Sequence, residues 1–219
     1  MKTLIITANI GGFDTPKSFI EQSLKCDFVS ITENNLPRPM TTLDDRMKAK
    51  YFKLQAHKLY PDYDIYIWMD SAFQIKAEGF ANRMIAELVN HDVAVTKHPD
   101  RNCIYTEAEF VLQGMIKGSN YLISRYSKSK INLERNYYES LLYPKDNGLY
   151  ACGLFARWNN EKLNSFFDKW WNACLMWSAF DQLSFPVLAK QNDIKINGIT
   201  FDKYTDNQFY QIIKHTKRA

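Results

Sequence analysis

The chain has 219 residues, of which 46% are hydrophobic and 24% charged, and its formal net charge is +4. This composition excludes a disordered or fibrous chain, and the longest apolar runs fall far below the ~18 residues that a membrane-spanning helix needs. The four cysteines are widely spaced, which excludes a zinc-type motif and favours reduced thiols. We therefore expect a cytoplasmic protein with one domain, residues 1–219, in which a strand and a polar tail at 190–219 complete the fold.

The N-terminal part of the chain predicts strands that alternate with helices. A hydrophobic strand at 2–8 ends in a turn with Gly11 and Gly12, where backbone amides can approach a ligand closely. This turn lacks the Gly-x-Gly-x-x-Gly and P-loop spacings, so a dehydrogenase or a P-loop kinase is disfavoured. A short helix at 16–24 and a second strand at 27–32 are expected to follow.

Basic residues form a stripe on the next predicted helix, at 44–59. Arg46, Lys50, Lys53 and His57 fall within about 40° of one another when residues are placed 100° apart. Apolar residues flank the stripe on both sides, whereas a solvated face is normally the widest polar arc of a helix. The stripe therefore indicates a partly enclosed site for an anion such as a diphosphate, with a solvated charged face as the alternative.

Asp70 directly follows the most hydrophobic predicted strand. Residues 65–69 are apolar on both alternating faces, as in the middle of a helix-covered sheet. A carboxylate at the end of such a strand lies at the ligand crevice of an open α/β sheet, where it can hold a metal ion or orient a substrate. On this strand alone, a turn capped by Asp70 and Ser71 explains the pattern equally well.

The second half of the chain continues the alternation, which predicts a mostly parallel mixed sheet flanked by helices. The expected elements are a helix at 80–90, a strand at 93–96, a helix that ends near 117, a strand at 148–157, a helix at 160–177, a short helix that begins at 181, and a strand at 194–201.

Further candidate residues surround these elements. His98 and Arg101 follow a buried strand, as Asp70 does, so we expect them at the same crevice edge, although a structural role for His98 is an equal alternative. Glu107 either pairs with Arg101 or interacts with a helix dipole. The basic segment 125–130 either shapes an acceptor channel or is a surface loop.

Several motifs together resemble a small GT-A glycosyltransferase-like family, formerly a domain of unknown function, which is related to the TOD1/MUCI70 proteins. The motifs are Arg46-x-x-x-Lys50 with Lys53 and His57, the strand end at 67–71, the block at 98–108, the strand at 148–157, Trp170-Trp171, and 181–185. The resemblance covers roughly residues 2–189. It implies a single α/β domain of GT-A (Rossmann-like) type that uses a nucleotide sugar.

The resemblance also implies roles for individual residues. The turn after the first strand would contact the nucleotide, and the basic stripe would hold the diphosphate. The substrate-binding residues expected on this basis are Thr7, Asn9, Gly11, Gly12, Arg46, Lys50, Lys53, His57, Ser71, His98, Arg101, Glu107 and Gln182.

Asp70 stands at the place of the Asp-x-Asp motif of GT-A enzymes, but Ser71 and Ala72 follow it, so the second carboxylate is absent. A divalent metal, Mn or Mg, would need its other ligands from diphosphate oxygens, water or a distant group such as His215. Alternatively, the basic residues alone would neutralise the diphosphate.

Asp181 is the second candidate catalytic residue beside Asp70. It would act as an acceptor-side base or as a carboxylate facing the anomeric carbon, and Gln182 would support it by a hydrogen bond. Helix N-capping is the alternative role for Asp181.

We therefore expect a hexosyl- or pentosyltransferase that moves a sugar from a nucleoside-diphosphate sugar of the UDP type to a hydroxyl group of a glycan. A phage-type transferase that modifies a hydroxylated base in DNA is one alternative, which the basic segments 125–130 and 214–218 permit. A non-catalytic nucleotide-sugar-binding module is the other, because the acidic motif is incomplete. The oligomeric state is not predicted.

Overall fold

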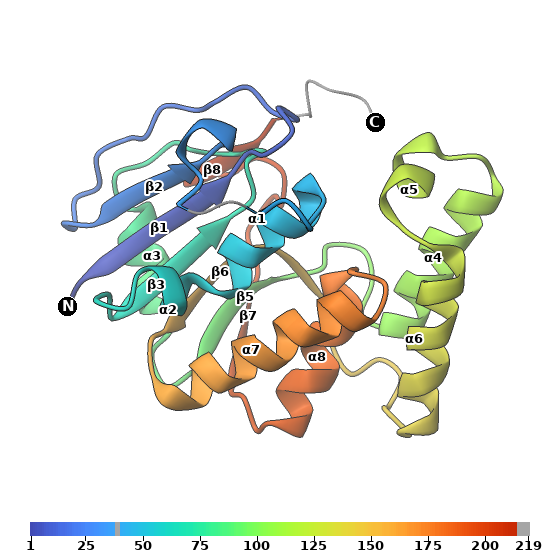
Figure 1. The fold of residues 1–219 in the computed structure, drawn as a ribbon. Coiled ribbons are helices and arrows are strands. Elements are labelled where there is room, and N and C mark those ends of the chain that lie inside the picture. The colour runs from blue at the N-terminus through green and yellow to red at the C-terminus, as the bar shows by residue number, and fades with distance from the viewer. Residues whose placement is uncertain (38–39, 214–219) are drawn as a thin grey trace.

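A computed structural model describes residues 1–37 and 40–213, and the predicted metal ligand His215 and the basic segment 214–218 lie outside them. Within this part of the chain, a six-stranded sheet has the order β2-β1-β3-β6-β5-β7, and a separate small sheet pairs β4 with β8 (Figure 1). The strands are β1 (Thr3–Ala8), β2 (Asp27–Ile31), β3 (Ile65–Met69), β4 (Phe73–Ile75), β5 (Val93–Lys97), β6 (Tyr150–Trp158), β7 (Ile196–Ile199) and β8 (Tyr210–Ile212).

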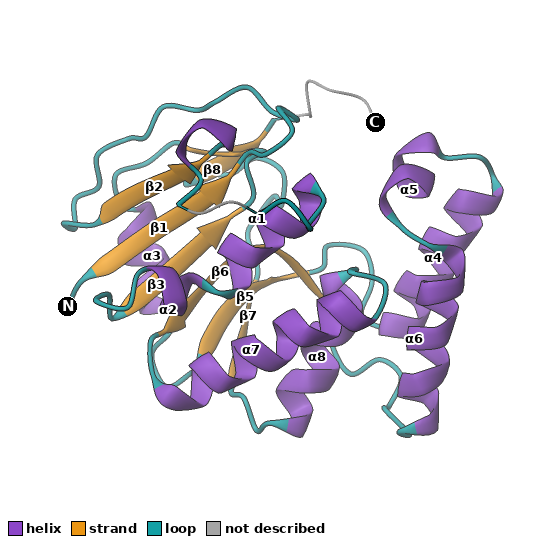
Figure 2. Ribbon diagram, viewed as in Figure 1, coloured by secondary structure: helices purple, strands orange, loops and turns teal. Residues whose placement is uncertain are grey.

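Helices cover the sheet and extend beyond it (Figure 2). They are the 3-10 helix η1 (Glu33–Asn35), α1 (Asp45–Leu54), α2 (Ala56–Leu59), α3 (Phe80–Ala86), α4 (Ile104–Ile116), α5 (Asn120–Arg125), α6 (Lys128–Ser140), α7 (Glu161–Met176) and α8 (Asp181–Gln191). In the part of the chain that is described, none of these helices is both long and apolar enough to cross a membrane.

The central sheet is mixed. β1 pairs in parallel with β2 and β3, and β5 pairs in parallel with β7, whereas β6 runs antiparallel to both of its neighbours, β3 and β5. The predicted fold class, a mostly parallel mixed sheet flanked by helices, is confirmed. Because β1, β3 and β5 run in the same direction, their carboxyl ends meet at one edge of the sheet.

Strand β3 is buried on both faces, as its sequence predicts. Tyr66 and Trp68 pack into the apolar cluster under α1, α7 and α8, while Ile65, Ile67 and Met69 pack into the cluster on the α3 face. The strand therefore lies at the centre of a three-layer arrangement, and Asp70 is the first residue beyond it.

Two expected helices differ from prediction. The helix at 16–24 is absent, because this segment is extended: Phe19 stacks on Phe28 (ring centres 4.5 Å apart), and Gln22 bonds to the backbone of Ala81 (2.9 Å). The helix predicted at 44–59 is interrupted at Gln55, which separates α1 from α2. The buried Gln55 amide donates to the carbonyl of Phe167 on α7 (3.3 Å), so packing against α7 accompanies the break.

Helices α4, α5 and α6 stand together at one side of the sheet (Figure 1, right). Their own apolar cluster includes Ile104, Val111 and Ile131, and it continues into Leu183 and Val187 of α8. These three helices are thus attached to the sheet layers through α8.

A buried carboxylate also ties α6 to the segment between α7 and α8. Glu134 is 1% exposed and accepts hydrogen bonds from the backbone N–H of Ser178 (3.2 Å), from the Ser178 hydroxyl, and from the hydroxyl of Tyr138 (2.9 Å). The Ser178 hydroxyl in turn accepts from the backbone N–H of Phe180 (3.1 Å). Glu134 therefore fixes the segment that leads directly into Asp181 at the start of α8.

Burial raises the pKa of Glu134 to about 7, although the hydrogen bonds from Ser178 and Tyr138 oppose this shift. The folded protein therefore keeps this proton between pH 4.5 and 7, whereas the unfolded chain loses it. Because the folded state then binds more protons, the contribution of Glu134 to the free energy of unfolding falls as the pH rises through this range.

We predict that Glu134→Gln becomes more stable relative to the wild type as the pH rises from 4.5 to 8, by up to about 3 kcal/mol. Urea unfolding at both pH values measures this difference. Glu139→Gln is a matched control on α6, because Glu139 is exposed. A difference between Glu134→Gln and the wild type that does not change with pH would contradict the predicted shift.

Candidate functional site

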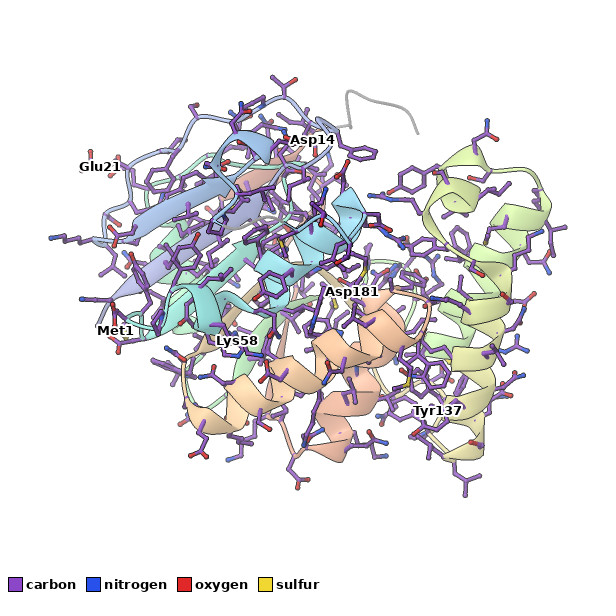
Figure 3. All side chains as sticks on the ribbon, viewed as in Figure 1. Met1, Asp14, Glu21, Lys58, Tyr137 and Asp181 are labelled. Carbon is purple, nitrogen blue, oxygen red and sulfur yellow. The ribbon has the colours of Figure 1, made fainter. Side chains whose placement is uncertain are left out.

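A cavity of about 520 Å³ opens where β1 and β3 end, between α1, α5 and the start of α8. Asp14, in the turn after β1, and Asp181, at the start of α8, are labelled in Figure 3 and both line it. Residues from both halves of the sequence line the cavity. Those that were predicted as site residues are Asn9, Arg46, Lys50, Lys53, Asp70, Ser71, Asp181 and Gln182.

Two lysines of α1 converge on one carboxylate oxygen. Lys53 Nζ lies 2.6 Å and Lys50 Nζ 2.9 Å from Oδ2 of Asp181. The spacing of three residues on α1 places both ammonium groups on the same helix face. All three side chains are at most 12% exposed, so these are ion pairs shielded from water.

This arrangement fixes the charge states of Asp181 and Lys53. Burial favours the neutral form of Asp181, but Lys50 and Lys53 outweigh it and hold the pKa of Asp181 well below its usual range. Burial likewise acts to lower the pKa of Lys53, and Asp181 and Asp70 together raise it well above its usual range. Lys53 is therefore cationic and Asp181 anionic at neutral pH.

Asp70 lies next to this group but is more open. Its side chain is 49% exposed, its Oδ1 accepts from the indole N–H of Trp68 (2.7 Å), and Lys53 Nζ is 3.8 Å away. Its backbone N–H donates to the carbonyl of Gly153 on β6 (2.8 Å). Any Cβ at Gly153 would lie 3.0 Å from Asp70 Oδ2, so this glycine leaves room for the carboxylate.

The glycine turn after β1 forms another wall of the cavity. Asn9 closes the turn, because its side chain donates to the carbonyl of Asp14 (2.6 Å) and accepts from the Asp14 N–H (3.1 Å). Gly11 and Gly12 have φ values of +84° and +61°, which favour glycine. The Ser71 hydroxyl donates to the Asp14 carboxylate, so the turn is tied to the residue after Asp70.

Arg46 and Tyr126 form the side of the cavity toward α5. The guanidinium carbon of Arg46 lies 4.9 Å from the centre of the Tyr126 ring. Arg46 Nη1 is buried and has no hydrogen-bond partner among the described residues. A buried donor without a partner is costly, and an anionic ligand would satisfy it.

His57 does not line the cavity, although it was predicted as part of the basic stripe. It lies beyond the interruption at Gln55, where its Nε2 contacts Asp168 (3.2 Å) and its Nδ1 contacts Arg157 (3.1 Å). Burial and the Arg157 charge lower the pKa of His57 to about 4, so it is neutral at pH 7. Its contacts are those of a buried structural histidine.

His98, Arg101 and Glu107 form a cluster of their own that does not line the cavity. Arg101 donates to the carboxylate of Glu107, and its Nη2 lies 3.2 Å from Nε2 of His98. The expected pairing of Arg101 with Glu107 is present. His98 and Arg101 follow β5, whose carboxyl end lies at the same sheet edge as that of β3, as expected. They do not share the cavity with Asp70, because β6 lies between β3 and β5 in the sheet.

Thr7, Gly11 and Gly12 also fall outside the lining of this cavity. Thr7 lines a neighbouring space of only about 20 Å³. The two glycines shape the turn whose neighbours, Ile10 and Phe13, line the main cavity.

The donor set does not fit a metal ion held by the protein alone. In residues 1–37 and 40–213, no group of three or more His, Cys, Asp and Glu side chains is placed to hold one. Asp181 pairs with two lysines, Asp45 pairs with Lys48 (2.8 Å), and Asp70 lies beside the cationic Lys53. The other two carboxylates of the cavity, Asp14 and Asp44, accept hydrogen bonds from the Ser71 hydroxyl and the Met47 N–H.

Three contributors to this region were not predicted from the sequence: Gly153, Tyr126 and Glu134. The apolar pattern at 148–157 predicted the strand but carried no sign that Gly153 would face Asp70. Glu134 acts on a segment more than forty residues away, through Ser178. Such contacts depend on tertiary packing and leave no local pattern.

The comparison with solved structures finds only weak likenesses. The apo structure of the WbbM bifunctional glycosyltransferase has a TM-score of 0.48 and 10% identity, over 89% of this chain but 38% of that one. Mouse xyloside xylosyltransferase 1 in its apo form has a TM-score of 0.46 and 8% identity, over 91% and 85% of the two chains. Core-mannan synthase A from Aspergillus fumigatus, in an Mn/GDP form, has a TM-score of 0.42 and 10% identity, over 100% and 78%.

The chain thus spans less than half of the first of these proteins. Identities this low say nothing about a shared substrate. The comparison with curated proteins finds none that matches the chain.

A protein-family model gives a clear assignment. The model described as "TOD1/MUCI70, glycosyltransferase-like domain" matches residues 37–218, which include α1, β3, α5 and the start of α8. The two lysines lie on α1 and Asp181 lies at the start of α8, while Asp70 and Tyr126 directly follow β3 and α5. The resemblance inferred from the sequence motifs is confirmed, and the chain belongs to the TOD1/MUCI70 glycosyltransferase-like family.

Proposed function

We propose that this protein transfers a hexose or pentose from a nucleoside-diphosphate sugar, with UDP as the carrier, to a hydroxyl group of a glycan. The observation that supports this most strongly is the meeting of Arg46, Lys50 and Lys53 with Asp70 and Asp181 in one cavity of about 520 Å³. That volume lies within the roughly 300–1,000 Å³ of small-molecule and cofactor sites. Membership of a glycosyltransferase-like family supports the same reaction class.

The diphosphate would lie against α1. Each lysine ammonium has three donors, and Asp181 takes one from each of Lys50 and Lys53, so further donors remain for phosphate oxygens. Arg46 adds the unpartnered Nη1. These groups would stabilise the negative charge that develops on the leaving diphosphate, and one such donor is worth roughly 3 kcal/mol in comparable sites.

The two carboxylates would have different roles. Because Lys50 and Lys53 hold the pKa of Asp181 so low, Asp181 is a poor proton acceptor. It would orient the two lysines and present a fixed negative charge to the positive charge that develops on the sugar. Asp70, which is half exposed at the mouth of the cavity, is better placed to accept the proton of the acceptor hydroxyl.

The turn after β1 would hold the nucleotide. Asn9 and Asp14 keep the turn closed, and Gly11 and Gly12 allow its backbone conformation. A turn of this kind can present backbone N–H groups to a ligand without steric hindrance.

We predict that Lys50→Gln and Lys53→Gln each weaken UDP binding at least about tenfold, because each change removes one charge-assisted contact to phosphate. Isothermal titration calorimetry measures the dissociation constants. Lys48→Gln is the matched control, since Lys48 is on the same helix but pairs with Asp45 and does not line the cavity. Equal weakening by all three changes would indicate a general charge effect and would contradict a diphosphate site.

We predict that Asp70→Asn and Asp181→Asn each lower turnover of the nucleotide sugar at least about a hundredfold. Asp100→Asn should leave turnover unchanged, because Asp100 is exposed in the segment after β5 and does not line the cavity. The measurement is release of UDP with a panel of UDP-sugars. If neither Asp70→Asn nor Asp181→Asn alters turnover, the two catalytic assignments are wrong.

We also predict that UDP binding persists when divalent ions are removed, because lysine and arginine side chains supply the positive charge. Thermal shift with UDP, in EDTA and with added manganese, tests this, since a bound ligand raises the melting temperature by mass action. A shift seen only with manganese would mean that diphosphate oxygens and Asp70 together recruit the ion.

A further inference from the structure

A second cavity, of about 310 Å³, lies on the far side of Arg46 and Tyr126. It is bounded by the start of α1, by the connection from α5 to α6, and by the end of α7 with the segment that follows it. The two cavities share wall residues, which are Asp44, Arg46, Ser124, Arg125 and Tyr126. A molecule in the second cavity would therefore lie next to the first cavity, across the wall residues that the two share.

The second cavity has an excess of positive charge. Arg46, Arg125 and Lys130 line it, and none of the three forms an ion pair with a carboxylate within the described part of the chain. Its acidic residue, Asp44, already accepts the hydrogen bond that caps α1, from the N–H of Met47 (2.7 Å). Arg46 also lines the first cavity, and the Arg125 guanidinium donates to the Tyr121 hydroxyl. Among the described residues, Arg125 and Lys130 are thus the cations without carboxylate partners that a ligand of the second cavity would meet, and they favour an anionic ligand.

The same cavity has an aromatic and apolar wall. Trp177 and Ile123 line it, and Trp177 stacks on Tyr137, which is labelled in Figure 3, with ring centres 5.0 Å apart and an angle of 25° between the planes. Tyr137 is 43% exposed, so this aromatic pair continues from the cavity to the surface. Aromatic faces offer large, rigid contact areas that suit the apolar faces of sugar rings.

The segment that carries Trp177 is held in place by Glu134 through Ser178, which also lines the cavity. The buried contact between Glu134 and Ser178, which positions Asp181, therefore also holds this wall in place before a ligand binds. A preformed wall lowers the cost of ordering the site when a ligand binds.

We propose that the second cavity binds an anionic sugar residue of the acceptor glycan, with Arg125 and Lys130 contacting the anionic group and Trp177 packing against the sugar ring. The inference rests on the proposed donor site in the first cavity. The proposal defines the class of acceptor, which is a glycan that carries a carboxylate or a phosphate. The reacting hydroxyl of this glycan would reach the donor sugar past Arg46.

The test uses UDP-saturated protein and a set of matched trisaccharides: one with a uronate residue, its carboxyl-reduced neutral counterpart, and the same neutral trisaccharide with a phosphate monoester. Calorimetry measures the three dissociation constants for the wild type, Lys130→Gln and Lys128→Gln. Lys130 lines only the second cavity, and Lys128 is exposed on the same helix and lines neither.

The expected result is that the wild type binds at least one anionic trisaccharide about tenfold or more tightly than the neutral one. Lys130→Gln should reduce this preference at least about threefold, and Lys128→Gln should keep it. The comparison of uronate with phosphate identifies the anionic group.

Equal affinity for the charged and neutral sugars, no binding of any of the three, or a preference unchanged in Lys130→Gln would overturn the proposal. A separate titration of the wild type with UDP tests the proposed donor site, so its failure can be told apart from a failure of the acceptor proposal. If UDP does not bind, the same trisaccharide titrations on the free protein still decide whether the second cavity selects anionic sugars.

Discussion

The buried ion pair between Lys53 and Asp181 is the interaction on which the site depends. It joins α1 to α8 across 128 residues of sequence, with a distance of 2.6 Å between the charged atoms. Charged side chains that are buried in a protein must be paired, because loss of one partner leaves the other charge buried without compensation. The position of Asp181 at the start of a helix adds a favourable interaction with the helix dipole. The pair therefore fixes the distance between the basic face of α1 and the first turn of α8.

Two further features stabilise the positions of Lys53 and Asp181, one on the side of the sheet and one on the side of the helices. On the sheet side, Asp70 leaves β3 beside Lys53, and Gly153 of β6 leaves space for its carboxylate. On the helical side, Glu134 holds the segment before Asp181. The cavity thus lies between a sheet edge and a set of helices attached to it, and both are needed to keep the charged groups in place.

Much of the fold and part of the site follow from local sequence patterns. The apolar run at 65–69 predicted β3 and the position of Asp70, and the spacing of the basic residues predicted that three of them share one face of α1. His57 does not share this face, because the helix is interrupted at Gln55. A glutamine within a helical sequence pattern gives no clear sign of such a break. His98 and Arg101 follow β5 at the same sheet edge as Asp70, but the antiparallel β6 lies between β3 and β5, and local periodicity does not predict the order of strands in a sheet. The contacts of Asp181 and of Glu134 bring together distant segments, so only the tertiary structure reveals them.

In the proposed site, Lys50 and Lys53, oriented by Asp181, bind the diphosphate of a nucleotide sugar. The most direct measurement is a crystal structure of the protein with UDP. We expect phosphate oxygens within about 3 Å of both ammonium groups, the usual range for charge-assisted hydrogen bonds, with the uridine beside the turn at Gly11 and Gly12. A diphosphate bound elsewhere on the protein, with both lysines still paired only to Asp181, would contradict it.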